Sequence, residues 1–200
     1  MNKVDIKSEI SNMKEYASLN NVPIMQDDGI EFLETFIEKK QIKNILEIGT
    51  AIGYSAIKMA LVRDDVHITT IERDETRYLE ALKNIKKCHL EDRITLIFND
   101  ALNVELEDNY DLIFIDAAKG KNKEFFNHFE KNLDADGYII TDNMSFHGYV
   151  EMDIEEIESK NIRGIVTKIK DYIYFLENHM FYKTTIYKIG DGIAVTERRG

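Results

Sequence analysis

Two short polar segments follow apolar, β-rich runs in the second half of the sequence. Asp116 ends the run YDLIFID, and Asp142 and Asn143 end the run GYIITDN. The ends of neighbouring strands lie roughly 5 Å apart in a sheet, so these three side chains can converge. Two carboxylates and an amide oxygen form a hard, partial oxygen shell that suits Mg²⁺, Mn²⁺ or Ca²⁺ and leaves positions for water or substrate. The spacing therefore predicts a divalent-metal site.

Lys119 follows Asp116 within the segment FIDAAKG. A dication at Asp116 would disfavour the protonated form of the Lys119 ammonium, which makes this side chain a candidate general base. The alternative is a solvated surface lysine, the commoner fate of this residue type. Asp142 and Asn143 have their own alternative as a turn pair. The position of both segments at strand ends favours the chemical interpretation.

The stretch LEIGTAIGYS ends an apolar run and contains two glycines before a helix-like run resumes. Gly49 and Gly53 let the chain turn tightly and bring backbone N–H groups against a ligand, while Ser55 offers a hydroxyl near the start of the next helix. The spacing is Gly-x-x-x-Gly, which differs from the Gly-x-Gly-x-x-Gly of dinucleotide binders. The loop therefore predicts a nucleoside ligand and disfavours a dehydrogenase.

Acidic residues stand at the ends of the first three predicted strands. Glu47 precedes the glycine loop, Glu72 ends the run HITTIE, and Asp100 with Ala101 follows RITLIF. A carboxylate at Glu72 can accept both hydroxyls of a ribose, and the Asp100–Ala101 pair can border an adenine ring. Each acidic residue alone is more simply a solvated strand end. Together, in register with the glycine loop, they favour a ligand site.

The elements that position these residues follow from hydrophobic periodicity. Short β-rich runs alternate with amphipathic helical runs from Asn44 onward, which is typical of right-handed βαβ units in an α/β fold with a mostly parallel sheet. Gly190-Asp191-Gly192 predicts a hairpin turn. We expect one domain over 1–200, with helices at 5–19, 27–40 and 163–178, a core at 44–143, and a substrate-side segment at 144–200.

Composition narrows the classes of protein. The chain has 200 residues, a formal charge of −11 and one cysteine. Indiscriminate nucleic-acid binding depends on clustered Lys and Arg, which such a charge disfavours. No apolar run approaches the ~18 residues of a membrane helix, and a cytoplasmic location is the expectation. One basic segment stands out in this acidic chain and contains Lys160, Arg163, Lys168 and Lys170.

These motifs resemble the class I S-adenosylmethionine-dependent, divalent-metal-dependent O-methyltransferases of the catechol and caffeoyl-CoA type. The resemblance covers Pro23 to the C-terminus, through PIMQDDGIEFL, LEIGTAIGYS, TIE, FIDAAKG and TDN. It implies a Rossmann-like, doubly wound, seven-stranded sheet with an antiparallel hairpin, and commonly a homodimer. The site residues it implies are Glu47, Gly49, Gly53, Ser55, Glu72, Asp100, Ala101 and Asp116 for the donor, Asp116, Asp142 and Asn143 for the metal, and Lys119 as the base.

The sequence says least about the acceptor, the molecule that would receive the methyl group. The loop MSFHGYV, like the whole chain, lacks the tryptophan of plant-type members, and RGIVTKIKDYIYFLENHMFYKTTIYKIGDGIAV resembles bacterial tRNA 5-hydroxyuridine methyltransferases. That implies a tRNA anticodon loop as partner, with Arg163, Lys168 and Lys170 toward its phosphates. Adjacent oxygens of 5-hydroxyuridine match a catechol, and loop bases can be splayed out. The alternatives are a small-molecule catechol-type O-methyltransferase and a donor-binding regulator without catalysis.

Overall fold

The computed structural model describes residues 3–117 and 119–200, without the side chains of residues 3–5 and 119. The chain falls into two compact units, which meet in sequence between Val104 and Glu105. The unit up to Val104 carries all the predicted donor residues except Asp116. The unit Glu105–Gly200 carries the predicted metal residues and the basic segment.

The first unit has a parallel sheet of three strands. β1 pairs with β2, and β2 pairs with β3, so the carboxyl ends of the three strands lie at the same edge. The apolar residues of β1 are buried on both faces, as expected for a parallel strand. Asp74 caps α4 by accepting a hydrogen bond from Arg77 N at 2.9 Å. The elements are α1 (Lys3–Leu19), α2 (Asp27–Lys40), β1 (Asn44–Ile48), α3 (Tyr54–Ala60), β2 (His67–Glu72), α4 (Glu75–Lys87), β3 (Ile94–Phe98) and η1 (Ala101–Asn103).

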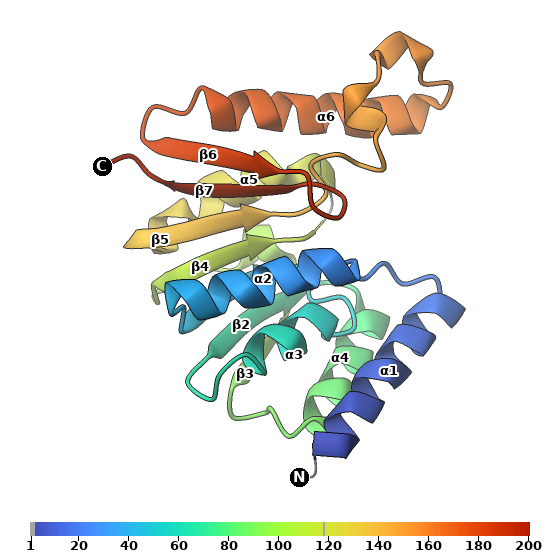
Figure 1. Ribbon diagram of the computed structural model, residues 1–200, viewed down its shortest axis with the longest axis vertical. Helices are drawn as coiled ribbons and strands as arrows, with labels where there is room; N and C mark the ends of the chain where they lie inside the picture. The colour runs from blue at the N-terminus through green and yellow to red at the C-terminus, as the bar shows by residue number, and fades with distance from the viewer. Residues whose placement is uncertain (1–2, 118) are drawn as a thin grey trace. The chain divides into compact units, whose positions relative to one another are not determined.

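The second unit combines a parallel pair with an antiparallel hairpin, and Figure 1 shows its strands β6 and β7 running in opposite directions. β4 pairs with β5 in parallel, and β5 pairs with β7 antiparallel. The elements are β4 (Tyr110–Ile115), η2 (Lys119–Lys121), α5 (Asn122–Phe129), η3 (Glu130–Asn132), β5 (Leu133–Thr141), η4 (Tyr149–Glu151), η5 (Ile154–Glu156), α6 (Lys160–Glu177), β6 (Tyr182–Tyr187) and β7 (Ile193–Arg198).

An aromatic cluster forms the core beneath α5 and α6. The Phe126 ring is fully buried and lies edge-on to Phe175 and Tyr182, with both pairs of ring centroids 5.3 Å apart. Such edge-to-face pairs add to the stabilisation from buried apolar area. Phe125 and Phe129 are also buried, so the phenylalanines of α5 are core residues.

The strand order is β3-β2-β1-β4-β5-β7-β6, which confirms an α/β fold with a seven-stranded, mostly parallel sheet and a C-terminal antiparallel hairpin. The helices expected at 5–19, 27–40 and 163–178 correspond to α1, α2 and α6. Periodicity indicated no regular element between Asn143 and Lys160, where the structure has two short 3₁₀ turns, η4 and η5. No helix within the described part of the chain has the length and apolar character of a membrane span.

Candidate active site

The three predicted metal ligands meet at the ends of β4 and β5. Ile115 is in register with Thr141, so the next residues, Asp116 and Asp142, leave the sheet at the same edge. Asn143 Nδ2 donates to Asp116 Oδ1 at 3.0 Å and to Asp142 Oδ2 at 3.1 Å. One amide group therefore bridges two carboxylates. These three residues are called the carboxylate corner below.

The carboxylate corner fits a hard divalent cation. Two carboxylates held side by side repel each other, and the Asn143 amide provides the positive end of a dipole between them. Amide oxygen and nitrogen are assigned from hydrogen bonding, so a half-turn of the Asn143 amide would present its oxygen to a cation. Among the described residues, no group of three His, Cys, Asp or Glu side chains is arranged to hold a metal ion. A cation here would therefore depend on the amide and on water or substrate oxygens, as Mg²⁺ commonly does.

Lys119 begins the short η2 turn after Asp116, but its side chain lies outside the described residues, and its role as base stays a prediction. The neighbouring Gly120 packs against Lys168 of α6. A Cβ on Gly120 would lie 3.0 Å from Lys168 Cδ and 3.2 Å from its Nζ. The Lys168 ammonium therefore lies beside the segment that follows Asp116.

The two glycines of the donor loop, residues 46–55, shape its turn. Gly49 has φ 103° and Gly53 has φ 84°, a left-handed conformation that favours glycine. Gly49 N donates to Ile71 O at 3.1 Å, and Gly53 N donates to Thr50 O at 2.8 Å. The predicted approach of backbone N–H groups of this loop to a ligand stays a prediction, and these two amides already have backbone acceptors. Their N–H groups close the turn, and β2 supplies one of the acceptors.

Glu47 is completely buried, so it is no solvated strand end. Its carboxylate accepts short hydrogen bonds from the Ser55 and Thr70 hydroxyls. Burial raises the pKa of Glu47 to about 7, although these two hydroxyl donors oppose the rise, and the nearby Glu72 carboxylate adds to it. A cationic group that reached Glu47 would stabilise its charged form.

Thr70, which was not among the predicted site residues, completes this arrangement. Its hydroxyl lies 2.6 Å from the Thr50 hydroxyl, and both side chains are buried. A hydroxyl in the middle of the apolar run HITTIE needs a partner when it is buried, and that signal was available. The partner itself depends on the parallel register that sets Glu47 opposite Thr70.

Glu72 is held in place by backbone groups. Its Oε2 accepts from Ala51 N at 2.8 Å, and its Oε1 accepts from Arg73 N at 2.9 Å and Asp74 N at 2.8 Å. The side chain thus ties the end of β2 to the donor loop. An ionised carboxylate has about four acceptor positions, and three are used here, so about one position remains for a ribose hydroxyl.

Asp100 and Ala101 lie at the end of β3. Asp100 Oδ1 accepts from Leu102 N at 3.1 Å and caps η1, while Arg73 Nη1 lies 3.2 Å from Asp100 Oδ2. Ala101 is buried. Arg73 was not predicted, because only the fold brings it to Asp100. Apart from Asp116, the residues expected at the donor lie on segments that follow or end β1, β2 and β3.

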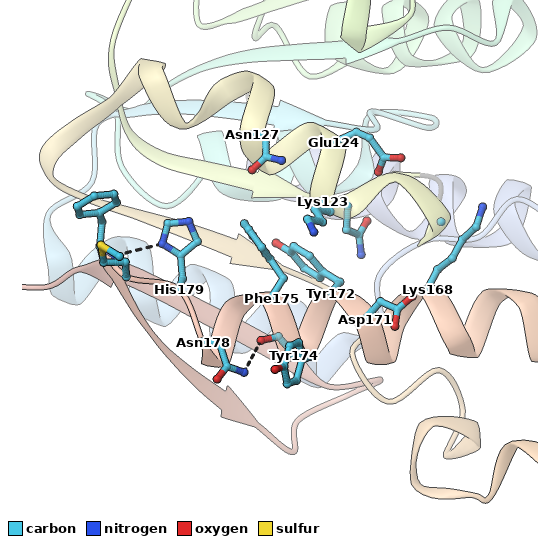
Figure 2. Close-up of a pocket in the computed structure, with 14 residues that line it drawn as sticks. Lys123, Glu124, Asn127, Lys168, Asp171, Tyr172, Tyr174, Phe175, Asn178 and His179 are labelled. Carbon is cyan, nitrogen blue, oxygen red and sulfur yellow. Dashed lines mark hydrogen bonds between the residues drawn. The ribbon is translucent and has the colours of Figure 1, made fainter.

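An open groove of about 900 Å³ runs along α5 and α6 in the second unit. Figure 2 shows Phe175 of α6 and His179, which follows that helix, directed toward α5, while Tyr174 and Asn178 are directed away from α5. Lys123 of α5 covers the Phe175 ring, with its Nζ 4.9 Å from the ring centroid. Lys168 lies at the end of the groove near Gly120.

The predicted tRNA-facing residues lie on α6 and have different neighbours. Lys168 borders the groove, whereas Lys170 Nζ donates to Met152 O at 2.8 Å. The Arg163 carbonyl accepts from the Thr167 hydroxyl within the helix. The segment 151–158, which contains five acidic residues, also packs against α6 through η4 and η5. The assignment of Arg163, Lys168 and Lys170 to tRNA stays a prediction.

The sheet topology, the glycine turn after β1 and the carboxylate corner together suggest an enzyme. Comparison with known proteins identifies its class. The profile of the O-methyltransferase family matches residues 3–199. The chain belongs to the O-methyltransferase family and is an S-adenosylmethionine-dependent O-methyltransferase.

Relatives from plants and bacteria agree with that assignment. The caffeoyl-CoA O-methyltransferase of Populus kitakamiensis is 28% identical over 193 residues, which span 92% of this chain and 82% of that protein. A solved Staphylococcus aureus protein, provisionally described as a caffeoyl-CoA O-methyltransferase, is 40% identical with a TM-score of 0.89, covering 95% of this chain and 92% of that one. A Bacillus cereus O-methyltransferase solved in complex with SAH is 25% identical, with a TM-score of 0.82 and coverage of 96% and 91%.

Proposed function

We propose that this chain uses its first unit to bind S-adenosylmethionine and its carboxylate corner to hold Mg²⁺ and an acceptor with two adjacent oxygens. The observation that carries this proposal is the pair of hydrogen bonds that join Asn143 to Asp116 and Asp142. The complex of the Bacillus cereus relative with SAH supports the donor. Mn²⁺ or Ca²⁺ would satisfy the same oxygen ligands.

The donor residues suit different parts of S-adenosylmethionine. The buried Glu47 carboxylate suits the cationic amino group, because that charge would compensate its burial. Glu72 suits the ribose hydroxyls, because three backbone amides already fix its orientation. Asp100 and Ala101 suit the adenine. Gly49, Gly53 and Ser55 shape the loop around the donor.

The acceptor side relies on positioning. When bound, a dication acts as a Lewis acid that lowers the pKa of an acceptor hydroxyl. Asp116, Asp142 and Asn143 would hold this ion, and Lys119 would take the hydroxyl proton. The acceptor oxygen then attacks the sulfonium methyl in line, the carbon–sulfur bond breaks, and the donor leaves as the neutral thioether. Asp116 is also the proposed contact of this unit with the donor.

The proposed acceptor is 5-hydroxyuridine at the wobble position of tRNA, which the enzyme would convert to 5-methoxyuridine. The resemblance of the C-terminal segment supports it, as does the position of Lys168 beside the segment after Asp116. Lys168 would then contact a phosphate, while Lys170 and Arg163 would contribute less. A cytoplasmic enzyme would meet this substrate.

A small catechol-like molecule is the second candidate, and a specific observation favours it. The acidic segment 151–158 beside α6 would repel a nucleic-acid backbone. The named plant relatives include a caffeoyl-CoA O-methyltransferase and a flavonoid 3′,5′-methyltransferase, whose acceptors are small molecules.

One experiment separates the two acceptors. The purified enzyme, with labelled S-adenosylmethionine and Mg²⁺, is offered tRNA from a strain that lacks the gene and, separately, caffeic acid. We expect label in 5-methoxyuridine by nucleoside mass spectrometry, at a kcat/KM well above that for caffeic acid. Transfer to caffeic acid alone would favour the small-molecule enzyme. Binding of the donor without transfer to either acceptor would favour a regulator.

We also propose that two copies of the chain associate. Tyr174, Met180 and Phe181 border the groove and are 69%, 77% and 65% exposed, and large exposed apolar side chains favour protein contact. Light scattering on wild-type protein and on Phe181→Asp tests this. A dimeric wild type and a monomeric variant would support the proposal, and a monomeric wild type would refute it.

A further inference from the structure

We propose that Asp191, in the turn between β6 and β7, is a positioning residue for the acceptor. It holds the loop that follows Asn143, residues 144–149, which is called the acceptor loop here. The inference rests on the proposed function, since it assumes that the acceptor binds at the carboxylate corner. It assigns a role to a hairpin turn that supplies neither a donor contact nor a metal ligand.

Three hydrogen bonds fasten the acceptor loop to this turn. Met144 N donates to Gly192 O at 2.9 Å, and Ser145 N donates to Asp191 O at 2.7 Å. His147 N donates to Asp191 Oδ1 in a short hydrogen bond. Only the last of these involves a side chain, so among the three bonds Asp191 is the residue whose identity matters.

The acceptor loop needs such an external support because of its backbone. Phe146 and His147 have φ 48° and 57°, Asn143 just before the loop has φ 65°, and Gly148 has φ 81°. Left-handed conformations are costly for residues other than glycine, and they persist only where the surroundings fix them. Asn143 lies just before the loop that Asp191 holds, and its own side chain is bound to Asp116 and Asp142.

The second oxygen of Asp191 is directed toward the same loop. Asp191 is 7% exposed, and its Oδ2 is buried without a hydrogen-bond partner among the described residues. His147 Nδ1 lies 3.6 Å from this oxygen. A buried carboxylate oxygen that lacks a donor attracts the imidazole N–H, which orients the largely exposed His147 ring.

Close packing confirms that the turn and the loop are built for each other. A Cβ on Gly192 would lie 2.7 Å from Ser145 N and 3.2 Å from Met144 C, and Gly192 has φ 85°. Only glycine allows this approach of two backbones. The contact therefore depends on the sequence of the turn and is no chance proximity.

The loop held in this way carries the side chains nearest in sequence to Asn143 that can shape an acceptor pocket. The Phe146 ring lies 5.5 Å from the His147 ring and 6.0 Å from the Tyr149 ring, measured between centroids. An aromatic acceptor beside the carboxylate corner would meet this group. Release of the loop should therefore weaken acceptor binding and leave donor binding unchanged.

The test compares Asp191→Ala with Asp191→Asn, because asparagine keeps an oxygen that can accept from His147 N. Asp136→Ala, at an exposed position of β5, is the matched control. Steady-state kinetics use tRNA that carries 5-hydroxyuridine, or caffeic acid if only that is methylated. We expect Asp191→Ala to raise the acceptor KM by roughly tenfold or more, with little change in kcat or donor Kd, and Asp191→Asn to restore most of it. An acceptor KM at the wild-type value in Asp191→Ala would overturn the proposal.

Amide hydrogen exchange provides an independent readout on the wild-type protein, so the proposal remains testable if Asp191→Ala fails to fold. The Ser145 and His147 amides should exchange slowly, and in the alanine variant the His147 amide should exchange at the rate of an open loop. Fast exchange of the His147 amide in the wild type would show that Asp191 does not hold the acceptor loop. Transfer to neither acceptor would refute the proposed function, while the exchange rates would still decide whether Asp191 holds the loop.

Discussion

The predicted donor residues in the first unit and the carboxylate corner in the second differ in the groups that hydrogen-bond to their carboxylates. Glu47 and Glu72 each accept hydrogen bonds on both carboxylate oxygens, and their partners belong to the strands and turns around them. At the carboxylate corner the amide of Asn143 bridges Asp116 and Asp142. Hydroxyl and backbone N–H groups therefore hold the donor-side carboxylates, whereas the two carboxylates of the corner share the amide of a third candidate ligand.

The largest expected effect is a loss of methyl transfer after a change at the carboxylate corner. Asp142→Ala removes one of two carboxylates from the proposed metal site, so methyl transfer should fall by about 10³-fold or more. Donor affinity should stay within about twofold, because the donor residues of the first unit are untouched. Single-turnover transfer and calorimetric donor titration measure the two effects. Equal losses in both would show that the two sides are not separable.

On the donor side, Glu47 should make the free energy of unfolding depend on pH. The folded-state pKa of Glu47, about 7, lies above its ordinary value of 4.5, so the folded protein binds more protons between these values. The free energy of unfolding should therefore fall as pH rises from about 4.5 through 7, by about 3 kcal/mol from this group. Denaturant unfolding at several pH values tests it against Glu47→Gln, which should lack this slope. Parallel pH profiles for the two proteins would contradict the assignment.

Donor affinity should depend on pH in the opposite direction to stability, and should increase as the pH rises. A cationic amino group at Glu47 favours the ionised carboxylate, so donor binding releases a proton below pH 7. Donor affinity should accordingly weaken as the pH falls from 7 toward 5. Calorimetry in buffers of different ionisation enthalpy detects the proton directly. Affinity that does not change over this range would place the amino group elsewhere.

A smaller effect is expected at the donor turn. Gly53→Ala forces a side chain into φ 84°, where the new Cβ would also meet Ala81 Cβ at 3.4 Å, so stability should fall by about 1–2 kcal/mol. Gly164→Ala is the matched control, since it lies in α6 with no atom within 4 Å of the new Cβ. That change should raise stability by about 0.5–1 kcal/mol. A Gly53→Ala protein as stable as wild type would contradict the turn argument.

The smallest effect concerns the acceptor. Lys168→Ala should weaken tRNA binding several-fold and lower the salt slope by about one unit, as expected for one lost phosphate contact. Lys170→Ala should do less, because the Lys170 ammonium already binds Met152 O. Filter binding over a range of salt concentrations measures both. If the two variants weaken tRNA binding equally, both lysines contact the nucleic acid, as the basic segment of the sequence predicts.

The contrast between the two regions also explains what could be read from the sequence. Parallel strands bring their carboxyl ends to one edge, so a run that ends in Asp116 and another that ends in Asp142 predict convergence without any structure. The amide of Gly49 could not be assigned, because its acceptor, Ile71 O, belongs to another strand. Arg73 and Asp191 were missed for the same reason, since their partners are distant in sequence. The division of Lys168 and Lys170 depends on which neighbours pack against α6.

The most direct test of the central claim is a count of bound Mn²⁺, which substitutes for Mg²⁺ and is detectable by electron paramagnetic resonance. We expect wild-type protein to bind one Mn²⁺ per chain, and both Asp142→Ala and Asn143→Ala to bind it at least tenfold more weakly, with Asp136→Ala at wild-type affinity. Mn²⁺ binding that is equally tight in all four proteins would place the ion elsewhere and contradict the account.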